Sequence, residues 1–211
     1  MSDELVLYTN PMSRGRIARW MMEELGQPYR AEIVGFGEPM KGPAYKAINP
    51  MGKVPALVHG ATIVTECAAI CAYLADAFPQ AGLAPAPGDR ARGAYYRWMF
   101  FAAGPVEAAV AAKAFGLSAP PEAARSLGYG TYADAMDTLE HAVSQGAYIA
   151  GDRFSAADVY VGSQIQWGLQ FGTIEKRPVF EAYGARLAER PAAQRAKRID
   201  DELMAQMQKA G

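Results

Sequence analysis

The hydrophobic pattern of this sequence changes at one short segment, GLAPAPG at positions 82–88. Before this segment, short apolar runs alternate with stretches of helical periodicity, whereas after it helical periodicity continues almost throughout. A segment so rich in proline and glycine has few groups able to pack, which is typical of a linker. We therefore expect a first domain at residues 1–80, a linker at 81–89 and a second domain at 90–211.

The first domain is predicted to be an α/β unit. A loop rich in glycine and proline is expected from Gly35 to Pro43. The order of elements, β-α-β, a loop and then β-β-α, indicates a compact unit with a mixed sheet. The predicted strands lie at 5–8, 30–34, 54–58 and 62–64, and the predicted helices run from Ser13 to the stop at Gly26 and from Glu66 to Phe78.

The second domain is predicted to be all-helical. It is rich in alanine, and prolines such as Pro105, Pro178 and Pro191 are expected at breaks between helices. Ser155 and Asp158 have the spacing of a capping box ahead of an apolar helix, so we interpret Asp158 as structural. The fold class is therefore α/β followed by all-α.

Composition narrows the functional classes. The formal net charge is −1 and no block of lysine and arginine occurs, which argues against a nucleic-acid or membrane-surface role. No stretch approaches the roughly 20 apolar residues of a membrane span, and the N-terminus lacks a signal-peptide pattern. Two cysteines, Cys67 and Cys71, and two histidines, His59 and His141, are too few for a thiol and imidazole metal cluster. We expect a cytoplasmic protein without a bound metal.

Three motifs follow one another along the chain: NPMGKVPAL at 49–57, ECAAI at 66–70 and GDRFSAAD at 151–158. Together with the two-domain pattern they resemble the soluble glutathione transferases, and the resemblance covers essentially the whole chain. It implies a thioredoxin-like first domain that binds glutathione and a helical second domain that lines the pocket of an electrophile. It also implies a homodimer, with glutathione as co-substrate and no other cofactor.

The resemblance implies a role for Pro55 and its neighbour Val54. In the family the peptide bond before this proline is cis, and the N–H and C=O of the preceding residue face the ligand. There they pair with the cysteinyl unit of glutathione, in the manner of a one-residue strand addition. Proline cannot donate a hydrogen bond, so the strand edge stays open to the ligand. The alternative is an ordinary edge-strand proline.

Glu66 and Cys67 are expected at the other end of glutathione. By resemblance, Glu66 accepts from the γ-glutamyl ammonium, and the helix N-terminus behind it favours the γ-glutamyl carboxylate. Cys67 stands where the family usually has serine, and a thiol is a weak donor, so we expect weaker affinity for glutathione. Alternatively, Glu66 is only a first-turn acid. Lys41 and Lys53 are the cations expected near the glycine carboxylate, although a loop lysine is often merely solvated.

Ser13 is the predicted catalytic residue. The chemistry requires a thiolate, and a hydroxyl donor near a helix N-terminus stabilises one. The segment from Ser13 to Leu25 resembles that of family members that use a serine, and Ser13 is also the expected N-cap of the first helix. Tyr8, at the end of the first strand, is the alternative donor, as in other classes.

Two functions fit these residues. The first is a glutathione transferase that activates the thiolate for attack on a small hydrophobic electrophile. The second is a non-catalytic binding or regulatory module with the same fold. The aromatic residues at 95–101 and Trp167 face either the core or the electrophile, and the sequence leaves this open.

Overall fold

The computed structural model describes residues 4–117 and 120–210. Contacts between Cα atoms divide the chain into two compact units. The first unit combines the residues up to Ala81 with those from Glu189 onward, and the second unit is Gly82–Ala188. The last helix therefore makes its contacts with the first unit, although the division drawn from sequence counted its residues with the helical domain.

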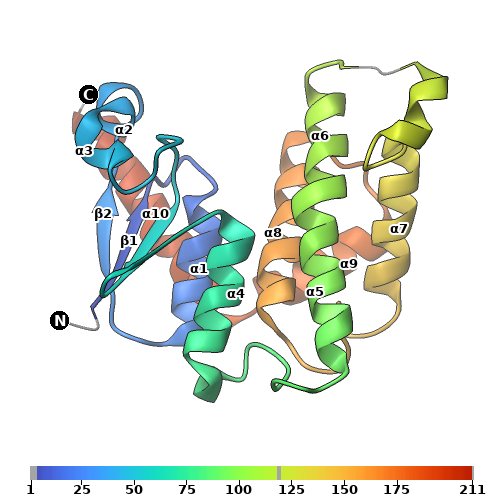
Figure 1. The fold of residues 1–211 in the computed structure, drawn as a ribbon, viewed down its shortest axis with the longest axis horizontal. Helices are drawn as coiled ribbons and strands as arrows, with labels where there is room; N and C mark the ends of the chain where they lie inside the picture. The colour runs from blue at the N-terminus through green and yellow to red at the C-terminus, as the bar shows by residue number, and fades with distance from the viewer. Residues whose placement is uncertain (1–3, 118–119, 211) are drawn as a thin grey trace. The chain divides into compact units, whose positions relative to one another are not determined.

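A four-stranded mixed sheet forms the centre of the first unit (Figure 1). Its strand order is β2-β1-β3-β4, with β1 parallel to β2 and the other pairs antiparallel. This confirms the predicted mixed sheet and a thioredoxin-like arrangement. The strands are β1 (Leu5–Thr9), β2 (Arg30–Ile33), β3 (Ala56–His59) and β4 (Thr62–Thr65).

The two faces of the sheet have different partners. Leu7 pairs with Leu57 on one face, where the His59 ring stacks on Phe78 just after α4 (Cys67–Ala77). Because side chains alternate along a strand, Tyr8 lies on the opposite face. There it packs against a buried cluster made by Val34, Met40, Tyr45 and Ala56.

Two short helices contribute to that cluster. They are α2 (Glu38–Lys41) and α3 (Pro43–Lys46), each with proline in its first turn. The prediction of a plain loop from Gly35 to Pro43 is therefore wrong in part. Four-residue helices carry too few residues to produce a readable helical period, so proline and glycine dominated the sequence signal.

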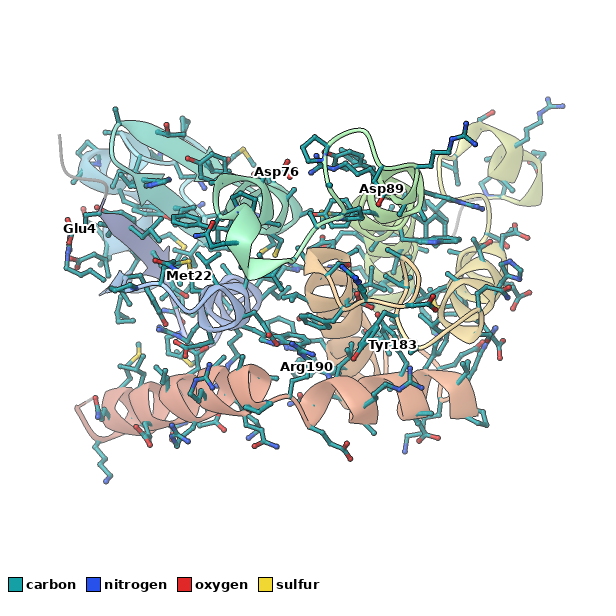
Figure 2. The ribbon with its side chains drawn as sticks, turned by 90° about the horizontal axis from the view of Figure 1, so that it is seen from below. Glu4, Met22, Asp76, Asp89, Tyr183 and Arg190 are labelled. Atoms are coloured by element: carbon teal, nitrogen blue, oxygen red, sulfur yellow. The ribbon has the colours of Figure 1, made fainter. Side chains whose placement is uncertain are left out.

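Helix α1 (Gly15–Leu25) lies between the sheet and α10 (Pro191–Ala210). Figure 2 shows α1 nearly end-on, with α10 running along one side of it and the labelled Met22 pointing toward the sheet. The helix ends at Gly26, which adopts φ +68°, a left-handed conformation that glycine adopts readily. This confirms the predicted stop.

The regular elements of the second unit are helical over its described residues. Pro105 does not break its helix, as the sequence suggested, but lies in a π-helical turn that joins α5 to α6. Because proline lacks an N–H, the wider turn accommodates the missing bond without ending the helix. The elements are α5 (Ala91–Phe101), η2 (Ala102–Val106), α6 (Glu107–Ala114), η3 (Pro121–Ser126), α7 (Tyr132–Ser144), α8 (Ala156–Phe171) and α9 (Pro178–Ala188).

Asp158 is buried at the start of α8 and has a structural role, as predicted. One carboxylate oxygen accepts from the N–H and the hydroxyl of Ser155, which completes the capping box. The other accepts from the Ile149 N–H at 2.8 Å and from the Tyr183 hydroxyl at 2.7 Å. Burial raises the pKa of Asp158, although these hydrogen bonds oppose the shift.

Candidate functional site

The turn at residues 10–13 joins β1 to α1 and is organised by Asn10. The Asn10 amide donates to the Val34 carbonyl at 2.9 Å, and its side-chain oxygen accepts from the Met12 N–H at 2.9 Å. The Asn10 carbonyl accepts from both the N–H and the hydroxyl of Ser13, at 3.1 and 2.7 Å. These bonds fix the Ser13 side chain at the entrance to α1.

Ser13 lies one residue before the helix N-cap. The prediction that Ser13 is the N-cap is off by one, because Arg14 already has helical dihedral angles and α1 begins at Gly15. The Ser13 hydroxyl nevertheless accepts from the Gly15 N–H at 3.0 Å. It therefore stands in the positive field of the helix N-terminus, where a nearby anion is favoured.

Gly15 is a site residue that the sequence analysis did not single out. A Cβ atom on Gly15 would lie 2.0 Å from Thr9 Oγ1 and 3.1 Å from Ser13 Oγ. Only glycine lets the first turn of α1 approach the end of β1 this closely. A glycine between Arg14 and Arg16, at the expected start of a helix, was the available signal for this approach.

Tyr8, the alternative donor, packs on the other face of the sheet. Its half-buried ring lies 5.9 Å from the ring of Tyr45. Tyr45 donates its hydroxyl to the Lys53 carbonyl at 2.8 Å, and burial raises the pKa of Tyr45 to about 12. The contacts of the Tyr8 ring are those of a packing residue.

Asn49 organises a second turn in the same way as Asn10. Its side-chain oxygen accepts from the Met51 N–H at 3.0 Å, and its amide donates to the Lys53 carbonyl at 2.7 Å. The tripeptide Asn-Pro-Met occurs at both places in the sequence. Asparagine before proline favours such a turn, so the repeated tripeptide was a signal for both positions that the sequence analysis did not use.

The peptide bond between Val54 and Pro55 is cis, which confirms the expectation from the resemblance. Pro55 is buried and precedes β3, which begins at Ala56 and lies between β1 and β4. The alternative of an ordinary edge-strand proline therefore does not hold, because β3 is an inner strand. Val54 lies directly before the hydrogen-bonded ladder.

The side chain of Lys41 bonds to the loop that precedes Val54. Its ammonium donates to the carbonyls of Gly52 and Met51 at 2.7 and 3.1 Å. These two bonds leave one of its three N–H donors for another acceptor. Lys53 is exposed, and its carbonyl holds the loop through Tyr45 and Asn49. Lys53 therefore belongs to this loop, and Lys41 bonds to it from the end of α2.

Glu66 has an unusual backbone conformation. Its φ is +65° and its ψ is 122°, and it is the only non-glycine residue with positive φ in the described ranges 4–117 and 120–210. Such a conformation costs on the order of 1–3 kcal/mol and is typical of functional sites. Its exposed side chain stands immediately before α4.

Cys67 connects α4 to the start of α1. It is the first residue of α4 and is buried, and its thiol donates to the Arg14 carbonyl at 3.5 Å. This contact brings Glu66 and Cys67 beside the segment that carries Ser13. Two helix N-termini therefore meet at one place, and their fields add.

The helical unit has a cavity of its own, of about 430 Å³. It does not involve the aromatic residues at 95–101, of which Tyr95 and Trp98 are buried and Phe100 is exposed. The Lys113 ammonium lies 3.9 Å from the centre of the Tyr132 ring at this cavity. The other lining residues include Ala109, Ala112, Leu127 and Tyr129.

In the part of the chain that the structure describes, no group of three or more histidine, cysteine, aspartate or glutamate side chains could hold a metal ion. Among the same residues, no helix combines the length and the apolar character needed to cross a membrane.

Known proteins resemble the chain over most of its length. Glutathione S-transferase GstA of Escherichia coli O157:H7 is 30% identical to it over 160 residues, which cover 74% of this chain and 77% of that protein. The chain belongs to the glutathione S-transferase family. The family model for the glutathione S-transferase N-terminal domain matches residues 12–77, a range that includes Ser13, Glu66 and Cys67.

Solved glutathione transferase structures share the fold. A glutathione transferase from Methylococcus capsulatus is 28% identical with a TM-score of 0.77, covering 93% of this chain and 98% of that one. A glutathione transferase homologue from Sulfitobacter, solved with bound glutathione, is 27% identical with a TM-score of 0.75 and the same coverage. Members of the family that resemble this chain therefore bind glutathione.

Proposed function

We propose that this family member binds glutathione in its first unit and transfers it to a small hydrophobic electrophile. The observation that carries the proposal is the contact between the Cys67 thiol and the Arg14 carbonyl, at 3.5 Å. This contact supports the proposal because it joins two segments. One carries Ser13, the predicted hydrogen-bond donor to the glutathione sulfur, and the other carries Glu66 and Cys67, the predicted contacts of the γ-glutamyl group.

The γ-glutamyl end of glutathione is assigned to Glu66 and Cys67. The exposed Glu66 carboxylate would accept from the ligand ammonium, and the N-terminal N–H groups of α4 would donate to the ligand carboxylate. The backbone conformation of Glu66 supports this role, because an unfavourable conformation persists where the site requires it.

The rest of glutathione is assigned to the loop that ends at Pro55. The N–H and C=O of Val54 would pair with the cysteinyl unit, just ahead of the β3 ladder. Lys41 has one N–H donor beyond its two loop contacts, and that donor is assigned to the glycine carboxylate. Lys53, exposed on the same loop, contributes a second positive charge.

Ser13 is assigned as the donor to the glutathione sulfur. Its single hydroxyl hydrogen points to the Asn10 carbonyl at 2.7 Å, so donation to sulfur requires the hydroxyl to rotate. A thiolate competes well with a carbonyl for that hydrogen, because a bond to a charged acceptor is roughly twice as strong as a neutral one. The N-terminal field of α1 acts in the same direction.

The alternative function is a non-catalytic module that keeps the glutathione site. Two measurements separate the functions: calorimetric binding of glutathione, and conjugation of glutathione to a panel of aryl halides and epoxides. Binding with turnover supports the transferase, whereas binding without turnover on every electrophile supports the module. Absence of binding contradicts the glutathione site itself.

A homodimer is proposed from the family resemblance. Light scattering at micromolar concentration should give twice the 22.7 kDa mass of the chain. A mass of one chain under the same conditions would contradict the dimer and leave the glutathione site untouched.

A further inference from the structure

Arg16 joins the turn that carries Ser13 to the C-terminal helix α10. Its Nε donates to the Pro11 carbonyl at 2.5 Å, and its Nη1 donates to Asp201 Oδ1 at 2.8 Å. The planar guanidinium presents its donors in a rigid fork, so the two bonds constrain each other's direction. The Arg16 side chain of α1 is therefore held by Asp201 of α10, and it also bonds to the turn at residues 10–13.

Further ion pairs join α1 to α10 and to the residue that precedes α10. Figure 2 shows the two helices side by side, with the labelled Arg190 just before α10. Arg190 pairs with Glu24 at 2.7 Å, and the buried pair of Arg19 and Asp200 lies at 2.7 Å. The Arg16 guanidinium also reaches the turn at residues 10–13, through its bond to the Pro11 carbonyl.

The Pro11 carbonyl is an effective point at which to hold this turn. Proline has no N–H, so its carbonyl is its only main-chain hydrogen-bonding group. Asn10 anchors one side of the turn to the Val34 carbonyl, and Arg16 anchors the other side through Pro11. Ser13 follows two residues later in this turn and bonds to the Asn10 carbonyl.

Asp201 is suited to hold Arg16 at neutral pH. Its second oxygen accepts from the Lys197 ammonium at 2.6 Å. Hydrogen bonds from Lys197 and from Arg16 lower the pKa of Asp201, while partial burial opposes them. The carboxylate is therefore ionised wherever a glutathione thiolate is formed.

We propose that Asp201 is a positioning residue, which acts through Arg16 and the Pro11 carbonyl to hold the Ser13 hydroxyl where the sulfur of glutathione is activated. This inference rests on the proposed role of Ser13. It makes the C-terminal helix part of the apparatus that sets the thiol pKa, although Asp201 itself touches no reacting atom.

The test replaces Asp201 and follows the bound thiol. In Asp201→Ala and Asp201→Asn, titration of thiolate absorbance in the ultraviolet should give a higher pKa for bound glutathione. The turnover number should fall by about tenfold, less than the roughly 100-fold that a 1 Å misplacement can cause, with little change in KM for glutathione. Asp201→Glu should recover part of both losses.

Glu202→Ala is the matched control. Glu202 is the next residue on α10 and lies 4.0 Å from Arg198 of the same helix, so its removal should leave the thiol pKa unchanged. An equal effect of Glu202→Ala would overturn the proposal, because it would reveal a general effect of charge on α10. Melting temperatures measured alongside identify any variant that has lost its fold.

Double variants test the path of the effect. Arg16→Ala with Asp201→Ala should raise the thiol pKa no further than Arg16→Ala alone. Asp201→Ala should have no effect on the thiol pKa in a Ser13→Ala background. If Ser13→Ala alone leaves the thiol pKa unchanged, the proposed role of Ser13 fails. If Ser13→Ala raises it and Asp201→Ala does not, only the positioning role fails.

Discussion

The Cys67 sulfur lies 3.5 Å from the main-chain oxygen of Arg14, so the N-terminal ends of α4 and α1 meet through a thiol. A thiol is a weaker donor than a hydroxyl, and position 67 lies at the N-terminal end of α4, to which we assign the γ-glutamyl carboxylate. We expect Cys67→Ser to lower KM for glutathione by about twofold to tenfold, the worth of one net hydrogen bond. Isothermal titration with glutathione measures the change directly.

The matched control for this variant is Cys71→Ala. Cys71 lies one turn further along α4 and is fully buried, and burial raises the pKa of its thiol well above the usual range. Its replacement should change stability and leave glutathione affinity alone. Unchanged or weaker binding in Cys67→Ser would show that the side chain at position 67 does not contact the ligand.

The backbone conformation of Glu66 predicts that two substitutions at this position differ in stability but have the same effect on glutathione binding. At φ +65°, glycine avoids the strain that any residue with a Cβ atom suffers. The free energy of unfolding of Glu66→Gly should therefore exceed that of Glu66→Ala by about 1 kcal/mol, once the greater entropy of unfolded glycine is subtracted. Equal stability of the two variants would argue against strain at this position.

Both variants should raise KM for glutathione far more than they lower the turnover number. They remove the binding of a remote charged group, which contributes equally to the ground state and the transition state. Steady-state kinetics with glutathione varied at saturating electrophile gives both constants. A fall in turnover at unchanged KM would contradict the assignment of Glu66 to the γ-glutamyl ammonium.

Much of the fold could be predicted because the signals are local. A short apolar run bounded by a turn signal predicted β1, and the 3.6-residue period of α1, with its stop at Gly26, predicted that helix to within two residues. Short helices such as α2 are too short to show a helical period, and Pro105 lies in a π-helical turn instead of at a helix break. Neither could be predicted from local pattern alone.

The candidate site likewise contains residues that the sequence could identify and contacts that it could not. Resemblance identified Ser13, Glu66 and Cys67, whose segments the structure brings together. The bond between Arg16 and Asp201 joins residues 185 positions apart, and no pattern in either segment specifies its partner. Contacts of this range follow from helix packing, which a single sequence does not reveal.

The close approach of Gly15 to Thr9 predicts a strong steric effect. A Cβ at position 15 would lie 2.0 Å from Thr9 Oγ1, so Gly15→Ala should lower the free energy of unfolding by about 1–3 kcal/mol. Thr9→Ala should restore most of this loss in the double variant, because it removes the clashing atom. Chemical denaturation of the single and double variants measures both changes.

Thr9→Val is the informative control for this pair. Thr9 Oγ1 is buried and has no hydrogen-bond partner among the described residues, so replacing it with a methyl group should cost little by itself. The methyl group keeps the clash, however, and Thr9→Val should not rescue Gly15→Ala. Rescue by both substitutions would mean that the helix shifts instead of colliding.

The pair of Arg16 and Asp201 predicts a specific dependence of stability on pH. Hydrogen bonds from Lys197 and Arg16 lower the pKa of Asp201 in the folded protein. Its contribution is therefore complete above the ordinary aspartate pKa and is lost as the pH falls through the lowered value. The melting temperatures of the wild type and Asp201→Asn should differ at neutral pH and converge in acid. A difference that stays constant down to the acid limit would contradict an ionised pair.

Ser13→Ala is the decisive variant for catalysis. A hydrogen bond to a charged group is worth roughly 1.5–3 kcal/mol, from which the loss of the neutral bond to the Asn10 carbonyl must be subtracted. The pKa of bound glutathione should therefore rise by about one unit, and turnover at neutral pH should fall by about tenfold. Ultraviolet titration of the thiolate and initial rates across pH measure the two effects.

Tyr8→Phe is the paired control for Ser13→Ala. The Tyr8 ring packs beside Tyr45, so phenylalanine keeps its packing and should leave the thiol pKa unchanged. Ser13→Ala also removes the bond from the Gly15 N–H, at a cost of about 1 kcal/mol, which leaves a typical domain folded. If Tyr8→Phe abolishes the thiolate while Ser13→Ala keeps it, the tyrosine is the donor and the assignment of Ser13 is wrong. If neither variant changes the thiol pKa, the sulfur is held by another group, and the buried Asn10 is the first to replace because it organises the turn.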